Sequence, residues 1–374
     1  MSISDQRRVF VHIGAPKTGT TYLQAILHHN QQRLAAAGIL YPQDIGNAHF
    51  HAALDLREAA FVGHRDPRVE GAWERVSSQV RGWTGPTAVI SHELLAAAKP
   101  EHAKRVLDSL APGEVHLIYT ARDIGRQIPA MWQESIKNGQ TLDFRTYVKR
   151  LRRPLRKGRA ARIFWRSQDP LDVLSRWSVI PADRVHVITV PPPGSAPDLL
   201  WRRLSEVIGL DADQCDIDVP RINESLGLAE TELVRRINVR LDGQLAWPDY
   251  EAVVKHDLAE GRLAQRRDSS RAALSPKQHS WTVGVSKRFA AGLESAGYHV
   301  VGDLADLVPA GAGSPDRRTR TPDPDTVIEA AADVLAQRLV EQASQRAGSP
   351  RERAKSVATR LRLSSMVRRL RGRR

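Results

Sequence analysis

The sequence has a single cysteine, Cys215, and therefore no internal disulfide bond. It contains no run of the roughly 20 apolar residues that a membrane-spanning helix needs. Its first residues do not resemble a signal peptide, because the charged residues Asp5, Arg7 and Arg8 lead directly into an apolar segment. Neither an internal repeat nor a cluster of metal-binding residues is visible. These absences favour a cytoplasmic globular protein, and 374 residues are enough for one large or two ordinary domains.

Positive charge is concentrated at the C-terminal end of the chain. Residues 346–374 contain eleven Lys and Arg and one Glu, a net charge of +10, which leaves about +4 of the total +14 for the rest of the chain. A second basic cluster spans residues 149–157. Neither segment has interleaved aromatic residues or a nucleic-acid-binding motif, so we expect no specific nucleic-acid partner.

The basic tail allows two interpretations. Val357, Leu361, Met366 and Leu370 lie loosely along one side of a helix, with arginines over most of the remainder. That pattern is compatible with a basic helix on an anionic membrane, so residues 346–374 would make peripheral contact with it. The same composition describes a solvated, disordered tail, which we consider the better interpretation. Nothing in the sequence indicates an oligomeric state.

Short apolar segments alternate with helical patterns in the first half of the chain. Strands are expected at residues 9–13, 86–90, 114–120 and 184–190. Strands that alternate with helices predict an α/β fold with a parallel sheet flanked by helices, whose ligands bind at the carboxyl ends of the strands. From Leu199 onward the pattern is largely helical.

This pattern also predicts the domain organisation. We expect one α/β domain over residues 1–309 and a linker rich in Gly, Pro, Asp and Arg over residues 310–325. A helix and the basic tail are expected over residues 326–374.

A glycine-containing loop separates the first expected strand from the first helical segment. Residues 14–19 read Gly-Ala-Pro-Lys-Thr-Gly, and helical spacing begins directly after them. A strand, a glycine loop and a helix start direct several backbone N–H groups and the positive end of a helix at one point, which suits a phosphate or a sulfate. The candidate binding residues are Ala15, Pro16, Lys17, Thr18, Gly19, Thr20 and Thr21.

The loop differs from that of nucleoside triphosphatases, in which Lys directly follows the second Gly. Here Thr20 follows Gly19, and Lys17 lies inside the loop. The order P-K-x-G-T-[ST], which residues 16–21 match at every position, resembles the 5′-phosphosulfate loop of sulfotransferases that use 3′-phosphoadenosine 5′-phosphosulfate (PAPS). The resemblance covers about residues 8–309. It implies a P-loop-type α/β fold, PAPS as co-substrate and adenosine 3′,5′-bisphosphate as product.

The resemblance also implies a site for the 3′-phosphate of the co-substrate. The family binds this phosphate with an Arg after a central strand and a Ser eight residues later. Arg122 follows the third expected strand, and a guanidinium binds phosphate through two parallel hydrogen bonds. Eight residues later the chain has Ala130, so one hydroxyl donor is missing. Thr120 and Gln127 are candidates to replace it.

Sulfuryl transfer needs a base for the proton of the attacking hydroxyl or amine. By analogy with phosphoryl transfer, most of the catalysis is expected from positioning and from charge stabilisation on the leaving oxygen, which fits Lys17. A base adds roughly 10²–10⁴-fold. The family uses a His or a carboxylate, and Glu93 is the first candidate because it begins the helical segment after the second strand. His92 is the second candidate, followed by His51 and His49.

For several of these residues, a purely structural role is an alternative to catalysis or binding. Glu93 is also suited to the first turn of a helix, where negative charge is favoured. Arg122 is able to pair with Asp123 or Glu134 instead of a phosphate. Asn223 and Ser225 resemble positions common in bacterial sulfotransferase-like proteins, where they would donate to cofactor phosphate or ribose, but they equally suit a helix cap.

The sequence therefore predicts a sulfotransferase that moves a sulfuryl group from PAPS to a hydroxyl or amine of a carbohydrate, lipid or small metabolite. One alternative is a P-loop kinase of a small molecule, although that class needs a lysine after the second glycine and an Asp for Mg²⁺, for which Asp123 is a poor substitute. A second alternative is a non-catalytic nucleotide-binding protein recruited by its basic tail. This second alternative stays open because Ala130 stands where the family has a serine that binds the 3′-phosphate.

Overall fold

The computed structural model describes residues 6–44, 46–153, 158–220, 225–266 and 270–347. The chain divides into two compact units, residues 1–322 and residues 323–374. Part of the segment predicted as a linker belongs to the first unit. Within it, backbone hydrogen bonds of 2.9 and 3.0 Å run from Ser314 to Leu274 and from Ala273 to Thr319.

The second unit contains the helix α14 (Pro324–Ala347). The basic tail after this helix lies outside the described residues, so its two interpretations stay predictions. Among the described residues, no helix is both long enough and apolar enough to span a bilayer.

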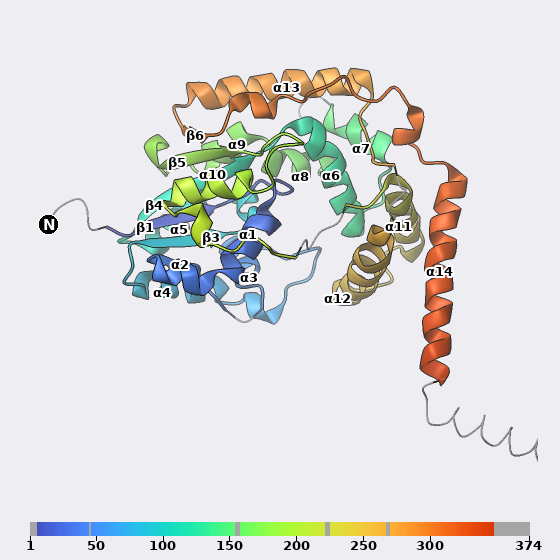
Figure 1. Cartoon of the computed structure of the whole chain (residues 1–374), viewed down its shortest axis with the longest axis horizontal. Helices are drawn as coiled ribbons and strands as arrows, with labels where there is room; N and C mark the ends of the chain where they lie inside the picture. The colour runs from blue at the N-terminus through green and yellow to red at the C-terminus, as the bar shows by residue number, and fades with distance from the viewer. Residues whose placement is uncertain (1–5, 45, 154–157, 221–224, 267–269, 348–374) are drawn as a thin grey trace, which may run out of the picture. The chain divides into compact units, whose positions relative to one another are not determined.

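Six strands form one parallel sheet in the order β2-β3-β1-β4-β5-β6 (Figure 1). They are β1 (Arg8–His12), β2 (Ile39–Leu40), β3 (Thr87–Ser91), β4 (Glu114–Ala121), β5 (Val185–Thr189) and β6 (His299–Val301). β1, β3, β4 and β5 confirm the four predicted strands to within one residue at each end. The sequence pattern does not predict β2 and β6, which have only two and three residues.

Helices flank this sheet and make up most of the first unit after β5. The α-helices of this unit are α1 (Thr20–His29), α2 (Gln31–Ala36), α3 (Ala48–Leu56), α4 (Ala72–Gly82), α5 (Pro100–Leu110), α6 (Ile124–Lys137), α7 (Phe144–Leu151), α8 (Arg159–Gln168), α9 (Pro170–Arg176), α10 (Leu199–Ile208), α11 (Leu228–Leu241), α12 (Trp247–Tyr250) and α13 (Pro276–Ser295). Two further segments matter for the site, the 3₁₀ helix η3 (Glu93–Ala97) and the π-helix η7 (Glu251–Arg262). The predicted α/β fold is confirmed.

Each strand contributes to two apolar cores, because successive side chains point to opposite faces of the sheet. Val9 and Val11 of β1 lie in the core shared with α3, α4, α5 and α9. Phe10, between them, lies in the core shared with α1, α2 and α10. In α1, Leu23, Ile26 and Leu27 share one helical face, and all three are buried against this second core. Helices therefore cover both faces of the sheet and leave its carboxyl edge for ligands.

Candidate active site

Three adjacent strands bring the three predicted motifs to one edge of the sheet. β1 pairs with β3 on one side and with β4 on the other, all parallel. The glycine loop follows β1, His92 and Glu93 follow β3, and Arg122 follows β4. Since parallel strands end at the same edge, these segments lie side by side. Figure 1 shows α6, α11 and α12 beyond this edge.

Two glycines allow the loop to lie close to its neighbours. Gly14 has a φ of 97°, and a Cβ atom there would lie 2.9 Å from Cα and Cβ of Glu93. Gly19 has a φ of 86°, and a Cβ atom there would lie 2.5 Å from Cδ2 of Leu200. Glycine adopts this left-handed backbone without strain and avoids both clashes. The loop therefore packs directly against Glu93 on one side and α10 on the other.

Helix α1 begins at the end of the loop without a side-chain cap. Gly19 occupies the N-cap position, and the first turn contains no acidic residue. Thr20 is buried and Thr21 is half-buried at this end. A helix start of this kind presents the positive end of the helix dipole and no nearby carboxylate of its own, which suits an anion.

A buried polar network fixes the underside of the loop. The Thr18 hydroxyl donates to the carbonyl of Ala15 (2.5 Å) and lies 2.5 Å from the hydroxyl of Thr120 on β4. His12, at the end of β1, bridges that Thr120 hydroxyl (3.3 Å) and the hydroxyl of Ser91 on β3 (2.8 Å). Burial lowers the pKa of His12 to about 4, so its ring stays neutral. The network ties the loop to both neighbouring strands.

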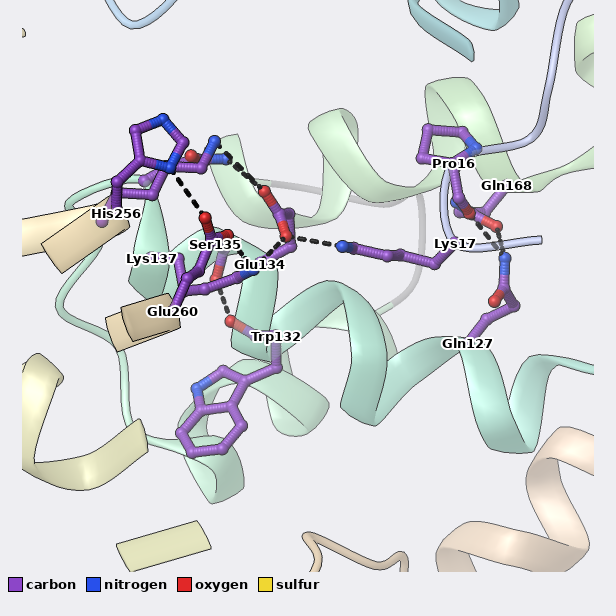
Figure 2. A network of polar contacts seen from close by, with 12 residues as sticks. Pro16, Lys17, Gln127, Trp132, Glu134, Ser135, Lys137, Gln168, His256 and Glu260 are labelled. Carbon is purple, nitrogen blue, oxygen red and sulfur yellow. Dashed lines mark hydrogen bonds and ion pairs between the residues drawn. The ribbon is translucent and has the colours of Figure 1, made fainter. Parts of the chain in front are cut away.

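Two glutamines hold the loop from the side of α6 and α8. Gln127 and Gln168 each donate to the carbonyl of Pro16, at 2.9 and 3.0 Å, and Gln127 also donates to Gln168 (2.7 Å). Figure 2 shows both amides converging on Pro16. Thr120 and Gln127, the predicted replacements for the missing family serine, are therefore both engaged in holding the loop.

The Lys17 side chain extends toward Glu134 of α6 (Figure 2). Its Nζ lies 2.6 Å from Oε2 of Glu134, and both side chains are about one quarter exposed. Two further lysines contact the same carboxylate, Lys137 at 3.3 Å and Lys255 at 3.7 Å. Burial alone would raise the pKa of Glu134, but the three lysines hold it well below its usual range.

Arg122 lies against the backbone of the loop. Its guanidinium donates to the carbonyl of Lys17 at 3.0 Å, and its Nε is buried with no hydrogen-bond partner. In the described part of the chain no carboxylate pairs with it, because Asp123 pairs with Arg126 and Glu134 pairs with lysines. Burial lowers the pKa of Arg122 to about 10, which still leaves it charged at neutral pH. The structural alternative of a salt bridge to Asp123 or Glu134 is therefore wrong.

Glu93 is the first residue of η3, beside the loop. Its Oε2 accepts a hydrogen bond of 3.2 Å from Gln24 of α1. Burial raises the pKa of this carboxyl, but neighbouring His92, the Gln24 amide and the nearby Lys17 outweigh burial and lower the pKa overall. Glu93 is thus an ionised carboxylate at neutral pH, the state that a proton acceptor requires.

His92 is the N-cap of η3 and directly follows Ser91, the last residue of β3. Nδ1 of His92 accepts a hydrogen bond of 3.2 Å from the backbone N–H of Leu94. Burial lowers the pKa of His92, so its ring is neutral, and its proton is then on Nε2. In this tautomer the ring has no second acceptor nitrogen.

His49 and His51 lie on α3. Both ring nitrogens of His49 are used, since one lies 2.9 Å from the carbonyl of Pro42 and the other accepts from the N–H of Ser91 (3.3 Å). Burial lowers the pKa of His49 to about 3 and also lowers that of His51. Nδ1 of His51 is buried without a partner. The contacts of His49 are those of a structural residue.

The remaining two candidates precede α11. Asn223 lies outside the described residues. Ser225 is exposed. The prediction that these residues bind the co-substrate therefore stays a prediction.

Sequence reasoning did not identify four residues that shape the site: His12, Gln24, Gln168 and Lys255. His12 carries a recognisable signal, because it is the one polar residue of the expected strand at residues 9–13. Lys255 lies 121 positions from Glu134 along the chain (255 − 134), and no local pattern marks that contact. It depends on how η7 packs against α6.

Comparison with solved structures shows similarity to a sulfotransferase from Alicyclobacillus acidocaldarius. The match covers 66% of this chain and 96% of that chain, with 19% sequence identity and a TM-score of 0.37. No family model matches the sequence, and no curated protein does. The proposal for function therefore depends on the residues of the site.

Proposed function

We propose that the protein is a sulfotransferase that transfers the sulfuryl group of PAPS to a hydroxyl or amine of an acceptor. The observation that carries this proposal is the position of Arg122, a guanidinium without a carboxylate partner among the described residues, 3.0 Å from the backbone of the lysine-bearing loop. Two cations at adjacent strand ends suit a nucleotide with anionic groups on both its 5′ and its 3′ side. The P-K-x-G-T-[ST] order of the loop agrees with that arrangement.

Each residue then has one role in the transfer. The loop and Lys17 bind the 5′-phosphosulfate, and Arg122 binds the 3′-phosphate. The acceptor oxygen or nitrogen attacks sulfur, and the bond between sulfur and the bridging phosphate oxygen breaks. Lys17 stabilises the negative charge that develops on this oxygen. The acceptor proton passes to the carboxylate of Glu93.

Glu93 is the better base of the two adjacent candidates. It is ionised and lies directly against the loop at Gly14. His92, by contrast, uses Nδ1 to cap η3 and has its proton on Nε2, so in this geometry it donates rather than accepts. We infer that His92 orients the start of η3 and thereby positions Glu93.

The kinase alternative receives less support from the site. The carboxylate after β4, Asp123, accepts from the N–H of Arg126 (2.8 Å) and pairs with the Arg126 guanidinium. Only 3% of Asp123 is exposed. The carboxylate of Asp123 is therefore engaged as the N-cap of α6 and as the partner of Arg126.

The experiment that tests the proposal is thermal unfolding with three nucleotides: PAPS, adenosine 3′,5′-bisphosphate and ATP with Mg²⁺. A ligand that binds only the folded state raises the melting temperature. We expect PAPS and the bisphosphate to raise it and ATP with Mg²⁺ to raise it less. A larger shift with ATP and Mg²⁺, or no shift with any of the three, would contradict the proposal.

A further inference from the structure

Lys17 belongs to a cluster of charges that reaches well beyond the loop. Glu134 binds Lys17, Lys137 and Lys255 through its two carboxylate oxygens. Lys137 also pairs with Glu260 of η7 at 2.7 Å. Figure 2 shows this chain of contacts running from the loop across α6 to η7. Through these ion pairs, three ammonium groups share two carboxylates, and Glu134 has three lysine partners.

Because Glu134 has three partners, its ion pair with Lys17 is easy to replace. When Lys17 turns to an anion bound at the loop, Glu134 keeps Lys137 and Lys255 as partners. Leaving a partly buried carboxylate without any partner costs free energy. Glu134 avoids this cost because two lysines still contact it. Both Lys17 and Glu134 are also about one quarter exposed, so water reaches the pair during the exchange.

Glu134 is in the right place to compete with a bound anion. Gln127 and Glu134 are two helical turns apart on α6, and both contact the loop, one at Pro16 and the other at Lys17. This face of α6 therefore follows the loop, and it presents a negative charge to the lysine that the proposed function assigns to the phosphosulfate. The low pKa of Glu134 keeps that charge in place at neutral pH.

We propose that Glu134 is an exchangeable counter-ion that holds the Lys17 ammonium until a phosphate or phosphosulfate group replaces it. It thereby sets the affinity of the loop for anions. This inference rests on the proposed function for the identity of the anion, although the exchange itself requires only an anion at the loop. It distinguishes Glu134 from Glu93, since the three lysines make Glu134 a poor proton acceptor.

The test is calorimetric titration of wild type and Glu134→Gln with two probes, adenosine 3′,5′-bisphosphate and inorganic pyrophosphate. Removing the competing carboxylate should tighten both probes by about fivefold, the affinity equivalent of a partly exposed ion pair. A residue that merely positions Lys17 would give the opposite sign, namely weaker binding. Unchanged or weaker binding of both probes in Glu134→Gln would overturn the inference.

Glu260→Gln is the matched control. Glu260 and Glu134 are equally exposed, at 21%, and both pair with Lys137, but Glu260 does not pair with Lys17. If general electrostatics explain the effect, both variants will tighten binding alike; the exchange predicts that Glu260→Gln changes affinity less than about twofold. A double-mutant cycle adds a second readout, because the gain from Glu134→Gln should disappear in a Lys17→Met background.

The remaining outcomes separate this inference from the proposed function. If the bisphosphate fails to bind but pyrophosphate binds more tightly to Glu134→Gln, the sulfotransferase assignment fails and the counter-ion stands. If neither probe binds to any of the proteins, the counter-ion inference is overturned. If Glu134→Gln fails to fold, Glu134→Asp is the second variant. Its shorter side chain keeps a negative charge beside Lys137 but moves that charge away from Lys17. Glu134→Asp should therefore still bind pyrophosphate more tightly than wild type does.

Discussion

At the scale of single residues, Arg122 combines a half-buried side chain with a contact to the loop backbone. The proposed contact with the 3′-phosphate is charge-assisted, so Arg122→Ala should weaken adenosine 3′,5′-bisphosphate by about 1.5–3 kcal/mol. Adenosine 5′-phosphate, which lacks that group, should lose much less affinity. Calorimetry on both nucleotides measures the difference.

Arg122→Lys serves as the control for this prediction. It retains a positive charge but lacks the planar fork, so it should recover only part of the affinity for the bisphosphate. Equal losses for the two nucleotides in Arg122→Ala would show that Arg122 supports the loop rather than the 3′-phosphate.

Glu93 allows an equally specific prediction at this scale. Glu93→Gln keeps the size of the side chain and the contact with Gln24 while it removes the proton acceptor. Turnover should fall by about 10²–10⁴-fold, with the affinity for adenosine 3′,5′-bisphosphate nearly unchanged. The measurement is product release from PAPS in the presence of hydroxyl and amine acceptors. If His92→Ala loses this much turnover while Glu93→Gln stays near wild type, His92 and not Glu93 is the proton acceptor.

At the scale of elements, α6 organises the site, because one of its faces contacts the loop at Gln127 and Glu134. Ala130 lies between them on the same face by helical spacing and is half-buried. Ala130→Ser should therefore place a hydroxyl where the family has one. It should tighten the bisphosphate by about 0.5–1.5 kcal/mol, the value of one neutral hydrogen bond, as measured by calorimetry. Weaker binding would mean that this face does not approach the ligand.

The elements also show which parts of the fold the sequence predicts. β1, β3, β4 and β5 are apolar segments of five to eight residues bounded by turn residues, and their signal is local. β2 and β6 have two and three residues, too few for a periodic pattern, and they exist because neighbouring strands pair with them. The π-helix η7 has no local signature either.

The same distinction applies to the site. The loop is recognised from adjacent residues, whereas the bond between Lys17 and Glu134 joins positions 117 residues apart (134 − 17). The role of His92 as a cap is visible only once the backbone is known. The site residues that are neighbours in the sequence were therefore predictable, whereas the partners that α6 and η7 supply from distant positions were not.

At the scale of the whole molecule, the buried histidines link stability to pH. Burial lowers the folded pKa of His12 from 6.5 to about 4, so between these values the unfolded chain binds more protons. The stability that neutral His12 contributes is complete above pH 6.5 and is lost as the pH falls toward 4. Between pH 7.5 and 5, this residue alone should lower the free energy of unfolding by about 2 kcal/mol.

Urea unfolding at both pH values measures this change, in a range where most carboxylates stay ionised. His12→Asn should reduce the difference between the two pH values, although other buried histidines such as His49 contribute in the same direction. A pH dependence that is the same in His12→Asn and wild type would show that His12 does not titrate in this way.

The most direct measurement for the central claim is transfer of radiolabelled sulfate from PAPS to a panel of hydroxyl and amine acceptors, by wild type and Lys17→Ala. Lys17 is placed to stabilise the leaving phosphate oxygen, so its loss should lower the rate by about 10²–10³-fold. The fold should persist, because a partly exposed ion pair contributes only about 0–1 kcal/mol to stability. Labelled product from wild type and almost none from folded Lys17→Ala is the predicted result. Near-normal transfer by folded Lys17→Ala, or no transfer by wild type to any acceptor of the panel, would contradict it.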